Sequence, residues 1–147
     1  MNEAFTIRRQ VEFNHCDPAG MVFYPRYFEM ISALVERFFA DGVNFSWIDM
    51  GALDGGMGTP TGNIEVRFRK PSRLGDWLDF SLSIERLGRS SATFEITCAS
   101  GGETRFDCIS TVVYANTHEG ASAPWPDAVR DRMSRYMTSQ DTKKEAL

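Results

Sequence analysis

The chain has 147 residues, 42% of them hydrophobic and 12% aromatic, which is enough apolar material for a buried core. Its 16 basic and 20 acidic residues leave a net charge of −4. This balance argues against a nucleic-acid partner, because surfaces that bind nucleic acid concentrate basic residues. We expect a single domain over residues 1–147.

The cysteine and histidine content excludes two further classes of protein. Three cysteines without a CxxC spacing predict reduced thiols rather than a disulfide framework. With two histidines in the chain, a histidine-rich metal site cannot form, and a zinc site would need Cys16 or carboxylates as well. The sequence contains neither the apolar run of a signal peptide nor the roughly 20 apolar residues of a membrane span. We therefore expect a cytoplasmic protein with no membrane partner.

The first half of the chain changes from the period of a strand to that of a helix. Apolar and polar residues alternate over residues 5–13, which predicts a half-buried strand, and the Asp-Pro-Ala-Gly run at 17–20 predicts a turn. A helical period follows over residues 27–40. Its apolar positions are Tyr27, Met30, Ile31, Leu34, Val35 and Phe38. Pro25 suits the first turn of this helix and Gly42 its end, so we expect a core helix enclosed on most sides.

The second half of the chain has the pattern of strands. Residues 41–60 predict a long connection with one short helical turn near Trp47, and connections of this length are often functional. Four alternating stretches then predict strands separated by glycine-containing hairpin turns. They cover residues 64–68, 78–84, 92–98 and 106–114. A helix over about 126–137 and a frayed tail after residue 140 complete the chain.

The order of these elements predicts the fold class. One strand and a long apolar helix precede four strands that we expect to form an antiparallel meander. A lone antiparallel sheet has one face that needs cover, and the apolar helix is the element that can cover it. We therefore predict an α+β fold of the hotdog type, a curved antiparallel sheet wrapped around a long central helix, although other α+β layers share this order.

Asp17 is the residue with the most suggestive position. It lies just before the predicted helix, where unpaired N–H groups and the positive end of the helix dipole are found. Attack on a carbonyl carbon needs a nucleophile or a base, and donors aimed at the oxyanion. A carboxylate beside free N–H groups supplies both. Asp-Pro is also ordinary turn chemistry, and from composition alone a capping role for Asp17 is the commoner one.

The sequence around Asp17 carries a family resemblance. The stretch VEFNHCDPAGMVFYPRYF, over residues 11–28, resembles the signature of the 4-hydroxybenzoyl-CoA thioesterase family. The core CDPAGxVxxPxY is matched by Cys16, Asp17, Pro18, Ala19, Gly20, Val22, Pro25 and Tyr27. The resemblance continues through Gly42, Trp47, Gly58-Thr59-Pro60 and the strand pattern to about Tyr114, so it covers most of the chain.

The resemblance implies a hotdog acyl-CoA thioesterase. Such an enzyme would hydrolyse aryl-CoA thioesters, such as 4-hydroxybenzoyl-CoA or benzoyl-CoA, or short acyl-CoA thioesters, to the free acid and CoA. Asp17 would be the nucleophile or the general base, and the backbone N–H of Tyr24 would polarise the thioester carbonyl. No metal or cofactor is implied, since CoA is part of the substrate. The subunits would dimerise through their sheets, and the dimers would pair into a homotetramer.

The same resemblance assigns residues that bind the acyl group. Thr59 would approach it from the neighbouring subunit, although a turn hydroxyl is an equally ordinary role. Tyr27, the last position of the motif, is a further candidate. Ser32 stands where the 4-hydroxybenzoyl enzymes are expected to carry an acid that receives the ring hydroxyl. A serine makes no charge-assisted bond, so the resemblance supports an acyl-CoA thioesterase more firmly than it supports the para-hydroxyl group.

A second group of residues resembles a CoA-binding patch. Arg86, Arg89, Ser90 and Ser91 surround a predicted hairpin turn and look like the place where these enzymes hold the nucleotide phosphates, whose geometry suits guanidinium groups. A typical member carries more positive charge at the positions of Gly88 and Ser90, which predicts weaker binding of the CoA nucleotide in this chain. Exposed arginines are also often simply solvated.

Two other functions remain open on the sequence. His15 lies two residues before Asp17, so both would share one face of a regular strand, and a His–Asp pair would suggest an acyl-CoA hydratase or dehydratase. The other is a non-catalytic acyl-CoA-binding module. Cys16 has no visible cause for a lowered pKa and is interpreted as a packed thiol. Arg130 and Arg132, on the last predicted helix, are interpreted as part of a solvated face.

Overall fold

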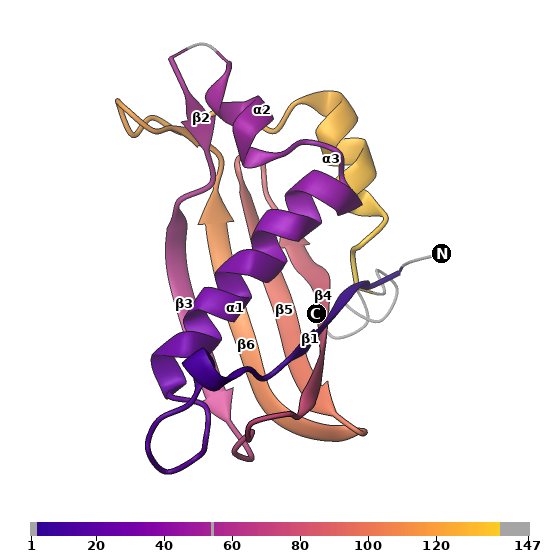
Figure 1. Cartoon of the computed structure of the whole chain (residues 1–147). Coiled ribbons are helices and arrows are strands. Elements are labelled where there is room, and N and C mark those ends of the chain that lie inside the picture. The colour runs from indigo at the N-terminus through magenta and orange to yellow at the C-terminus, as the bar shows by residue number, and fades with distance from the viewer. Residues whose placement is uncertain (1–2, 54, 139–147) are drawn as a thin grey trace.

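The computed structural model describes residues 3–53 and 55–138 (Figure 1). The chain begins with strand β1 (Phe5–Gln10) and the short 3-10 helix η1 (Phe13–His15), and then enters the long helix α1 (Tyr24–Arg37). The remaining elements are η2 (Phe38–Gly42, a π-helical extension of α1), α2 (Trp47–Gly51), β2 (Met57–Gly58), β3 (Thr61–Phe68), β4 (Trp77–Leu87), β5 (Ser91–Ser100), β6 (Glu103–Val113), β7 (Ala115–Asn116) and α3 (Asp127–Ser134).

Across the described residues, five strands form one antiparallel sheet in the order β1–β4–β5–β6–β3. Figure 1 shows the sheet curving around α1, which crosses its inner face diagonally. The predicted hotdog arrangement is confirmed. Within the described chain, no helix is long and apolar enough to span a membrane.

The predicted meander is wrong for one strand. β3 does not pair with β4 but lies at the far edge of the sheet beside β6, where Val66 is opposite Cys108. β1 takes the place beside β4, with Ile7 opposite Phe80. Alternation in the sequence identifies each strand but not its neighbour, so the crossing of segment 69–76 from β3 to β4 could not be anticipated.

The core lies between the inner face of the sheet and α1. The helix buries the side chains of Tyr27, Met30, Ile31, Leu34 and Val35. The alternate positions of β4, which are Leu78, Phe80, Leu82 and Ile84, face them and are also buried. Each such apolar side chain contributes roughly 1.5–3 kcal/mol through burial. The predicted core helix is confirmed, although it begins three residues earlier than the apolar period suggested.

The start of the chain departs from the predicted long strand. β1 ends at Gln10, and the side chain of Phe13, expected to face the core, is 83% exposed. The chain turns away from the sheet here because Glu12 and His15 close a capping box around η1, in which the Glu12 N–H donates to His15 Nδ1 at 2.9 Å.

The last helix is also more closely tied to the sheet than expected. α3 accounts for most of the predicted helix over 126–137, and the predicted tail after residue 140 lies outside the described residues. The guanidinium of Arg130 donates to the carbonyls of Gly88 at 2.7 Å and Leu87 at 3.3 Å, and that of Arg132 donates to the carbonyl of Val43. The solvated face predicted for these arginines is therefore wrong, because their guanidinium groups donate to backbone carbonyls of other elements.

Candidate active site

Asp17 lies in a closed loop between η1 and α1. Cys16 and Val22 face each other in an antiparallel bridge, and the Asp17 N–H donates to the Met21 carbonyl at 2.9 Å. Within the loop, Asp17 Oδ1 accepts from the N–H of Ala19 at 2.9 Å and from that of Met21 at 3.4 Å. The carboxylate, which is half-buried, therefore holds its own turn together.

This turn role leaves part of the carboxylate available. Both loop hydrogen bonds end on Oδ1 of Asp17, and no donor among the described residues bonds to Oδ2. The turn fixes the direction of the carboxylate, because two N–H groups hold one of its oxygens. The capping and reactive roles considered for Asp17 are therefore compatible in one geometry.

The first turn of α1 presents a free backbone donor close to this loop. Tyr24 is the first helical residue, and its predecessor Phe23 makes no side-chain capping bond. Pro25 has no N–H, and the Arg26 N–H already donates to the Phe23 carbonyl at 2.8 Å. Within the described part of the chain, no acceptor bonds to the Tyr24 N–H, which lies at the positive end of the helix dipole.

A cavity of about 260 Å³ opens between the start of α1 and the end of β3. It is lined by Met21, Val22, Tyr24, Tyr27, Phe68, Arg69, Lys70 and Pro71. Asp17 is not among these residues, but Met21 and Val22 belong to its loop. The ring of Tyr27 packs against Phe68, with the ring centroids 5.7 Å apart, while its hydroxyl contacts Ser72. Burial raises the pKa of the Tyr27 phenol, which therefore stays neutral.

A second cavity, of about 340 Å³, lies further along the same side of α1. Its lining residues are Phe28, Ile31, Ser32, Val35, Trp47, Thr59, Pro60, Thr61, Ile64 and Ser110. Ser32 and Thr59 thus meet in one chain, whereas the resemblance implied a Thr59 from the neighbouring subunit. The Trp47 indole N–H donates to Thr59 Oγ1 at 3.0 Å, so the hydroxyl proton of Thr59 can be given to a ligand.

Ser110 is a cavity residue that the sequence analysis did not select. It is buried on β6, at an inward position between Cys108 and Val112. The signal was present in the sequence, because Ser110 is the hydroxyl residue in an otherwise apolar alternation. Periodicity alone could not show which inward position borders a cavity rather than the packed core.

The residues proposed to hold the nucleotide lie around the connection between β4 and β5, at the end of the sheet opposite to the Asp17 loop (Figure 1). Arg86, near the end of β4, and Arg89, in the turn between β4 and β5, are exposed, and neither guanidinium has a carboxylate partner among the described residues. The 11 residues of β4 separate this turn from the end where Asp17 lies, a distance of roughly 33 Å at about 3.3 Å per residue. One chain therefore does not bring Asp17 and these arginines together.

The backbone of the same turn is firmly held. The Ser90 carbonyl accepts from the Tyr114 N–H at 2.7 Å, and the Arg89 carbonyl accepts from the Trp125 N–H at 3.0 Å. The Ser91 carbonyl accepts from the Trp125 indole at 3.0 Å and from the Gly88 N–H at 2.9 Å. Backbone fixed in this way leaves the side chains of Arg86 and Arg89 on a stable support at the surface.

His15 is committed to the structure rather than exposed to a substrate. It is 7% exposed, and its Nδ1 accepts the Glu12 N–H. Burial, reinforced by the charge of Arg9, lowers the pKa of His15.

The thiols of Cys98 and Cys108 are also buried, which raises the pKa of each to about 12 and leaves them protonated. Among the described residues, no group of three or more His, Cys, Asp or Glu side chains could hold a metal ion.

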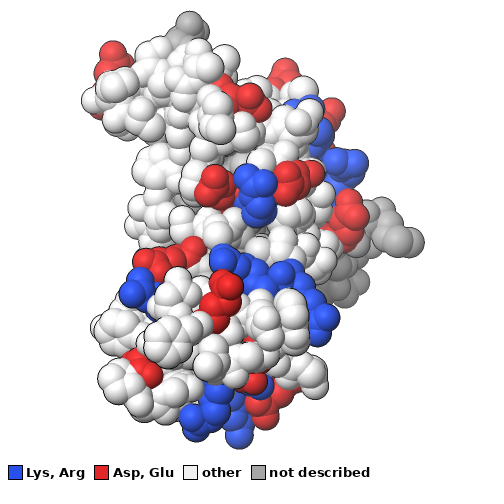
Figure 2. All heavy atoms as spheres, in the orientation of Figure 1, with Lys and Arg blue, Asp and Glu red and all other residues white. Residues whose placement is uncertain are grey.

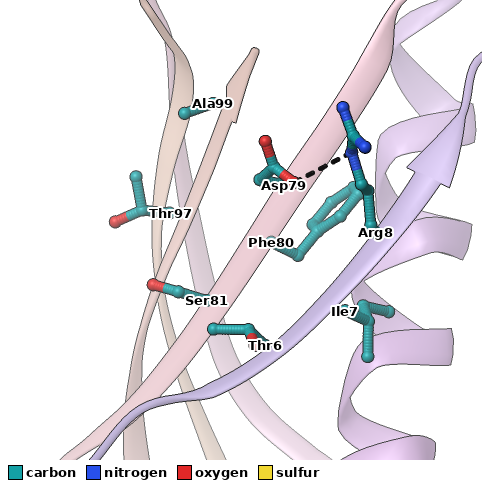
Figure 3. A pocket seen from close by; sticks show the side chains of 8 residues that line it. All are labelled: Thr6, Ile7, Arg8, Asp79, Phe80, Ser81, Thr97 and Ala99. Atoms are coloured by element: carbon teal, nitrogen blue, oxygen red, sulfur yellow. Dashed lines mark ion pairs between the residues drawn. The ribbon is translucent and has the colours of Figure 1, made fainter. Parts of the chain in front are cut away.

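A further hollow lies away from these residues. It has a volume of about 580 Å³ and lies over β1, β4 and β5 (Figure 3). Arg8 and Asp79 form an exposed ion pair at its edge, with Nε and Oδ1 3.3 Å apart, and Thr6, Ser81 and Thr97 line it. Figure 2 shows basic and acidic side chains interspersed on the face of the molecule that carries α1. No residue of the Asp17 loop lines this hollow.

The fold and the Asp17 motif define a member of a known group of proteins. A family model described as the Thioesterase-like superfamily matches residues 11–133, and the chain belongs to this family. The 4-hydroxybenzoyl-CoA thioesterase of Pseudomonas sp. (strain CBS-3) is 28% identical over 91 residues, which are 62% of this chain. The match spans 64% of that relative's length. The resemblance found in the sequence is therefore confirmed.

Solved structures agree with this assignment. A gentisyl-coenzyme A thioesterase has a TM-score of 0.77 and 25% identity, with 88% of this chain and 99% of that chain covered. A hypothetical protein from Staphylococcus aureus, solved in complex with CoA, has a TM-score of 0.85 and 17% identity, with 95% and 89% covered. At 17% identity the second likeness establishes the fold alone.

Proposed function

We propose that the chain is an acyl-CoA thioesterase, which hydrolyses aryl-CoA or short acyl-CoA thioesters to the free acid and CoA. The observation that carries the proposal is the half-buried carboxylate of Asp17 next to the start of α1. Within residues 3–53 and 55–138, neither Asp17 Oδ2 nor the Tyr24 N–H has a hydrogen-bond partner. Membership of the thioesterase-like family and a curated relative of that activity support it.

The chemistry follows from these two groups. The Tyr24 N–H donates to the thioester carbonyl and stabilises the negative charge that this oxygen gains in the transition state. Asp17 attacks the carbonyl carbon, expelling the CoA thiolate and leaving a mixed anhydride that water hydrolyses, or it takes a proton from the water that attacks instead. Both routes need an ionised carboxylate at the same place, and both end with the free acid and CoA.

The second cavity is the proposed place for the acyl group. Its walls are mostly apolar, as a benzoyl-sized group requires, and the hydroxyls of Ser32, Thr59 and Ser110 interrupt them. The Thr59 hydroxyl accepts the Trp47 indole N–H and keeps its own proton for a hydrogen bond to a ligand. Ser32 offers a neutral partner to a ring substituent. These residues fit an aryl acyl group that carries a polar substituent. They can also accommodate an aryl acyl group without such a substituent.

A second copy of the chain completes the proposed site. β3 pairs with β6 on one side only, and seven of its eight residues are exposed, including Ile64 at 38% and Phe68 at 49%. A long, partly apolar edge strand is a template for pairing with another strand. A dimer would let Arg86 and Arg89 of one copy hold the nucleotide of a thioester bound near Asp17 of the other. Pairing of such dimers would give the tetramer.

Substitution of Asp17 tests the proposal. In Asp17→Asn the side-chain oxygen can still accept from the Ala19 and Met21 N–H groups, so the loop should keep its shape. We expect kcat for benzoyl-type CoA esters to fall by at least about 10³-fold, since the reacting group is lost. Asp41→Asn is the matched control, because Asp41 is exposed in an ion pair with Arg37 at the other end of the helix, and its kcat should stay at the wild-type value.

The assay should follow both free thiol and the absorbance of a conjugated double bond over a panel of acyl-CoA esters. Release of thiol that disappears in Asp17→Asn supports the thioesterase. Thiol release that continues unchanged in this variant contradicts the role of Asp17. A change in double-bond absorbance without thiol would indicate a hydratase or dehydratase, and binding without either signal would indicate a module that only binds acyl-CoA.

A further inference from the structure

Ser72 joins three parts of the molecule at the edge of the proposed site. It lies in the segment between β3 and β4 and is 0% exposed. Its carbonyl accepts the Val22 N–H at 2.9 Å, so it pairs directly with the loop that holds Asp17. Its hydroxyl accepts from Arg105 Nη1 at 3.2 Å and contacts the phenol of Tyr27 on α1. The Asp17 loop, the helix and the sheet therefore meet at this serine.

Arg105 reaches this point from β6. Its side chain is 12% exposed, and Nη1 donates to Asp76 Oδ2 at 2.8 Å and to the Pro71 carbonyl at 3.0 Å. Asp76 Oδ2 also accepts the Arg73 N–H at 3.0 Å. That N–H and the guanidinium of Arg105 lower the pKa of Asp76, so its charge balances that of Arg105. The ion pair thus fixes both ends of the short segment that contains Ser72.

The direction of these bonds distinguishes Arg105 from a side chain that simply fills space. Nη1 makes its hydrogen bonds to segment 71–76, whereas Nε, although 3.2 Å from a carboxylate oxygen of Glu103, is buried without a hydrogen bond. The guanidinium is therefore directed at the segment that pairs with the Asp17 loop. Met21 faces Arg73 in the same pairing, so the loop is held along two successive residues.

We propose that Arg105 and Asp76 are positioning residues for hydrolysis, because their ion pair fixes Ser72 and, through the Val22 N–H, the loop that aims Asp17. The inference rests on the proposed role of Asp17. The path is short: Arg105 bonds to Ser72, Ser72 bonds to Val22, and Val22 bridges to Cys16 beside Asp17. A displacement of the order of 1 Å at a reacting group can cost about 10²-fold in rate, so a small shift of this loop is enough.

The test compares two Arg–Asp pairs of the same chain. Asp76→Asn removes the charge of the partly buried Arg105–Asp76 pair and keeps an acceptor oxygen, whereas Asp79→Asn does the same to the exposed Arg8–Asp79 pair (Figure 3). We expect Asp76→Asn to lower kcat by about 10- to 100-fold with KM nearly unchanged. Arg105→Lys, which keeps the charge, should lose less than Arg105→Gln. Asp79→Asn should keep the wild-type kcat.

Hydrogen exchange shows whether the effect is local. In Asp76→Asn, amides of residues 16–23 should exchange faster, while those of β5, in the middle of the sheet, should keep the wild-type rate. Wild-type kcat in this variant, unchanged exchange of the loop, or equal acceleration over the whole sheet would each overturn the inference. If the wild-type protein released no thiol, the proposed function would fail, and the exchange data would still decide whether Asp76 controls the loop.

Discussion

The two ends of the sheet are built in a similar way but carry different groups for the proposed reaction. At each end, an arginine from a neighbouring element donates to the carbonyls of a connection: Arg105 to the segment before β4, and Arg130 to the turn after it. At the first end the guanidinium is balanced by Asp76. Asp17 lies at the same end, and its Oδ2 accepts no hydrogen bond from the described residues.

At the second end the balance is different. Arg130 donates to the carbonyls of Leu87 and Gly88. The neighbouring Arg86 and Arg89 are exposed cations with no carboxylate partner among the described residues. A positive surface on rigid backbone suits a phosphate-bearing ligand, while a fixed carboxylate beside a helix start suits attack on a carbonyl. The chain therefore places the group proposed to react at one end of the sheet and the residues proposed to bind the nucleotide at the other.

The largest expected effect beyond Asp17 itself comes from the backbone donor at the first end. Tyr24→Pro removes the N–H that would stabilise the oxyanion, and the backbone tolerates it, because proline suits the first helical position and Phe23 is already extended (φ −72°, ψ 122°). We expect kcat to fall by about 10²- to 10³-fold. Tyr24→Ala removes the same ring and keeps the N–H, so steady-state assays of the two variants isolate the backbone group. Equal activities would remove Tyr24 from the proposed mechanism.

A smaller effect is expected at the second end. Neutralising both cations, in Arg86→Gln with Arg89→Gln, should raise KM for CoA esters by about 10-fold and leave kcat unchanged, since charge-assisted hydrogen bonds contribute about 1.5–3 kcal/mol. The increase should shrink as salt is added, because these side chains are exposed. Arg8→Gln removes another exposed arginine, in β1, and should not change KM. A fall in kcat in the double variant would contradict the division between the two ends.

The sequence predicted the parts of this molecule that depend on local pattern. The alternation of Leu78, Phe80 and Leu82 and the helical period of α1 led to the correct elements and fold, because each element buries one face. Strand neighbours depend on long-range pairing, so the position of β3 beside β6 was missed. The exposure of Phe13 was missed because η1 redirects the chain after β1.

The candidate site was predictable to the same extent. Asp17 and Tyr24 stand in a contiguous motif, and the structure places Tyr24 at the start of α1 and Asp17 in the loop that precedes it. The network of Ser72, Asp76 and Arg105 was not found, because its members are up to 33 residues apart and belong to no periodic pattern. Polar residues of this kind are normally interpreted as solvated. Their burial follows only from the crossing of the segment between β3 and β4.

A still smaller effect is expected in the proposed acyl cavity. Ser32→Asp would place an acid on its wall, where a phenolic ring substituent could donate to a charged rather than a neutral acceptor. We expect the ratio of kcat/KM for 4-hydroxybenzoyl-CoA over benzoyl-CoA to rise by about 5- to 10-fold, which matches the difference between charged and neutral hydrogen bonds. Ser32→Ala should leave the ratio unchanged or lower it. An unchanged ratio in the aspartate variant would place the acyl group elsewhere.

The smallest effect concerns His15, whose interpretation separates the thioesterase from the hydratase alternative. Burial first, and the charge of Arg9 second, lower the pKa of His15 from its ordinary 6.5 in the folded protein. The unfolded chain therefore binds a proton more readily than the folded one below pH 6.5. Stability supplied by the neutral imidazole is present above that pH and is lost as the pH falls through the lowered folded value.

His15→Asn keeps an oxygen that can accept the Glu12 N–H but cannot be protonated in this range. The wild-type protein should lose more in Tm between pH 7.5 and pH 5.5 than the variant does, as thermal unfolding at the two pH values would show. Thioester hydrolysis at pH 7.5 should remain near the wild-type rate, because the imidazole is neutral and committed to η1 there. A variant that keeps its Tm but loses turnover would make His15 a reacting group, and the first end of the sheet would then hold two such groups instead of one.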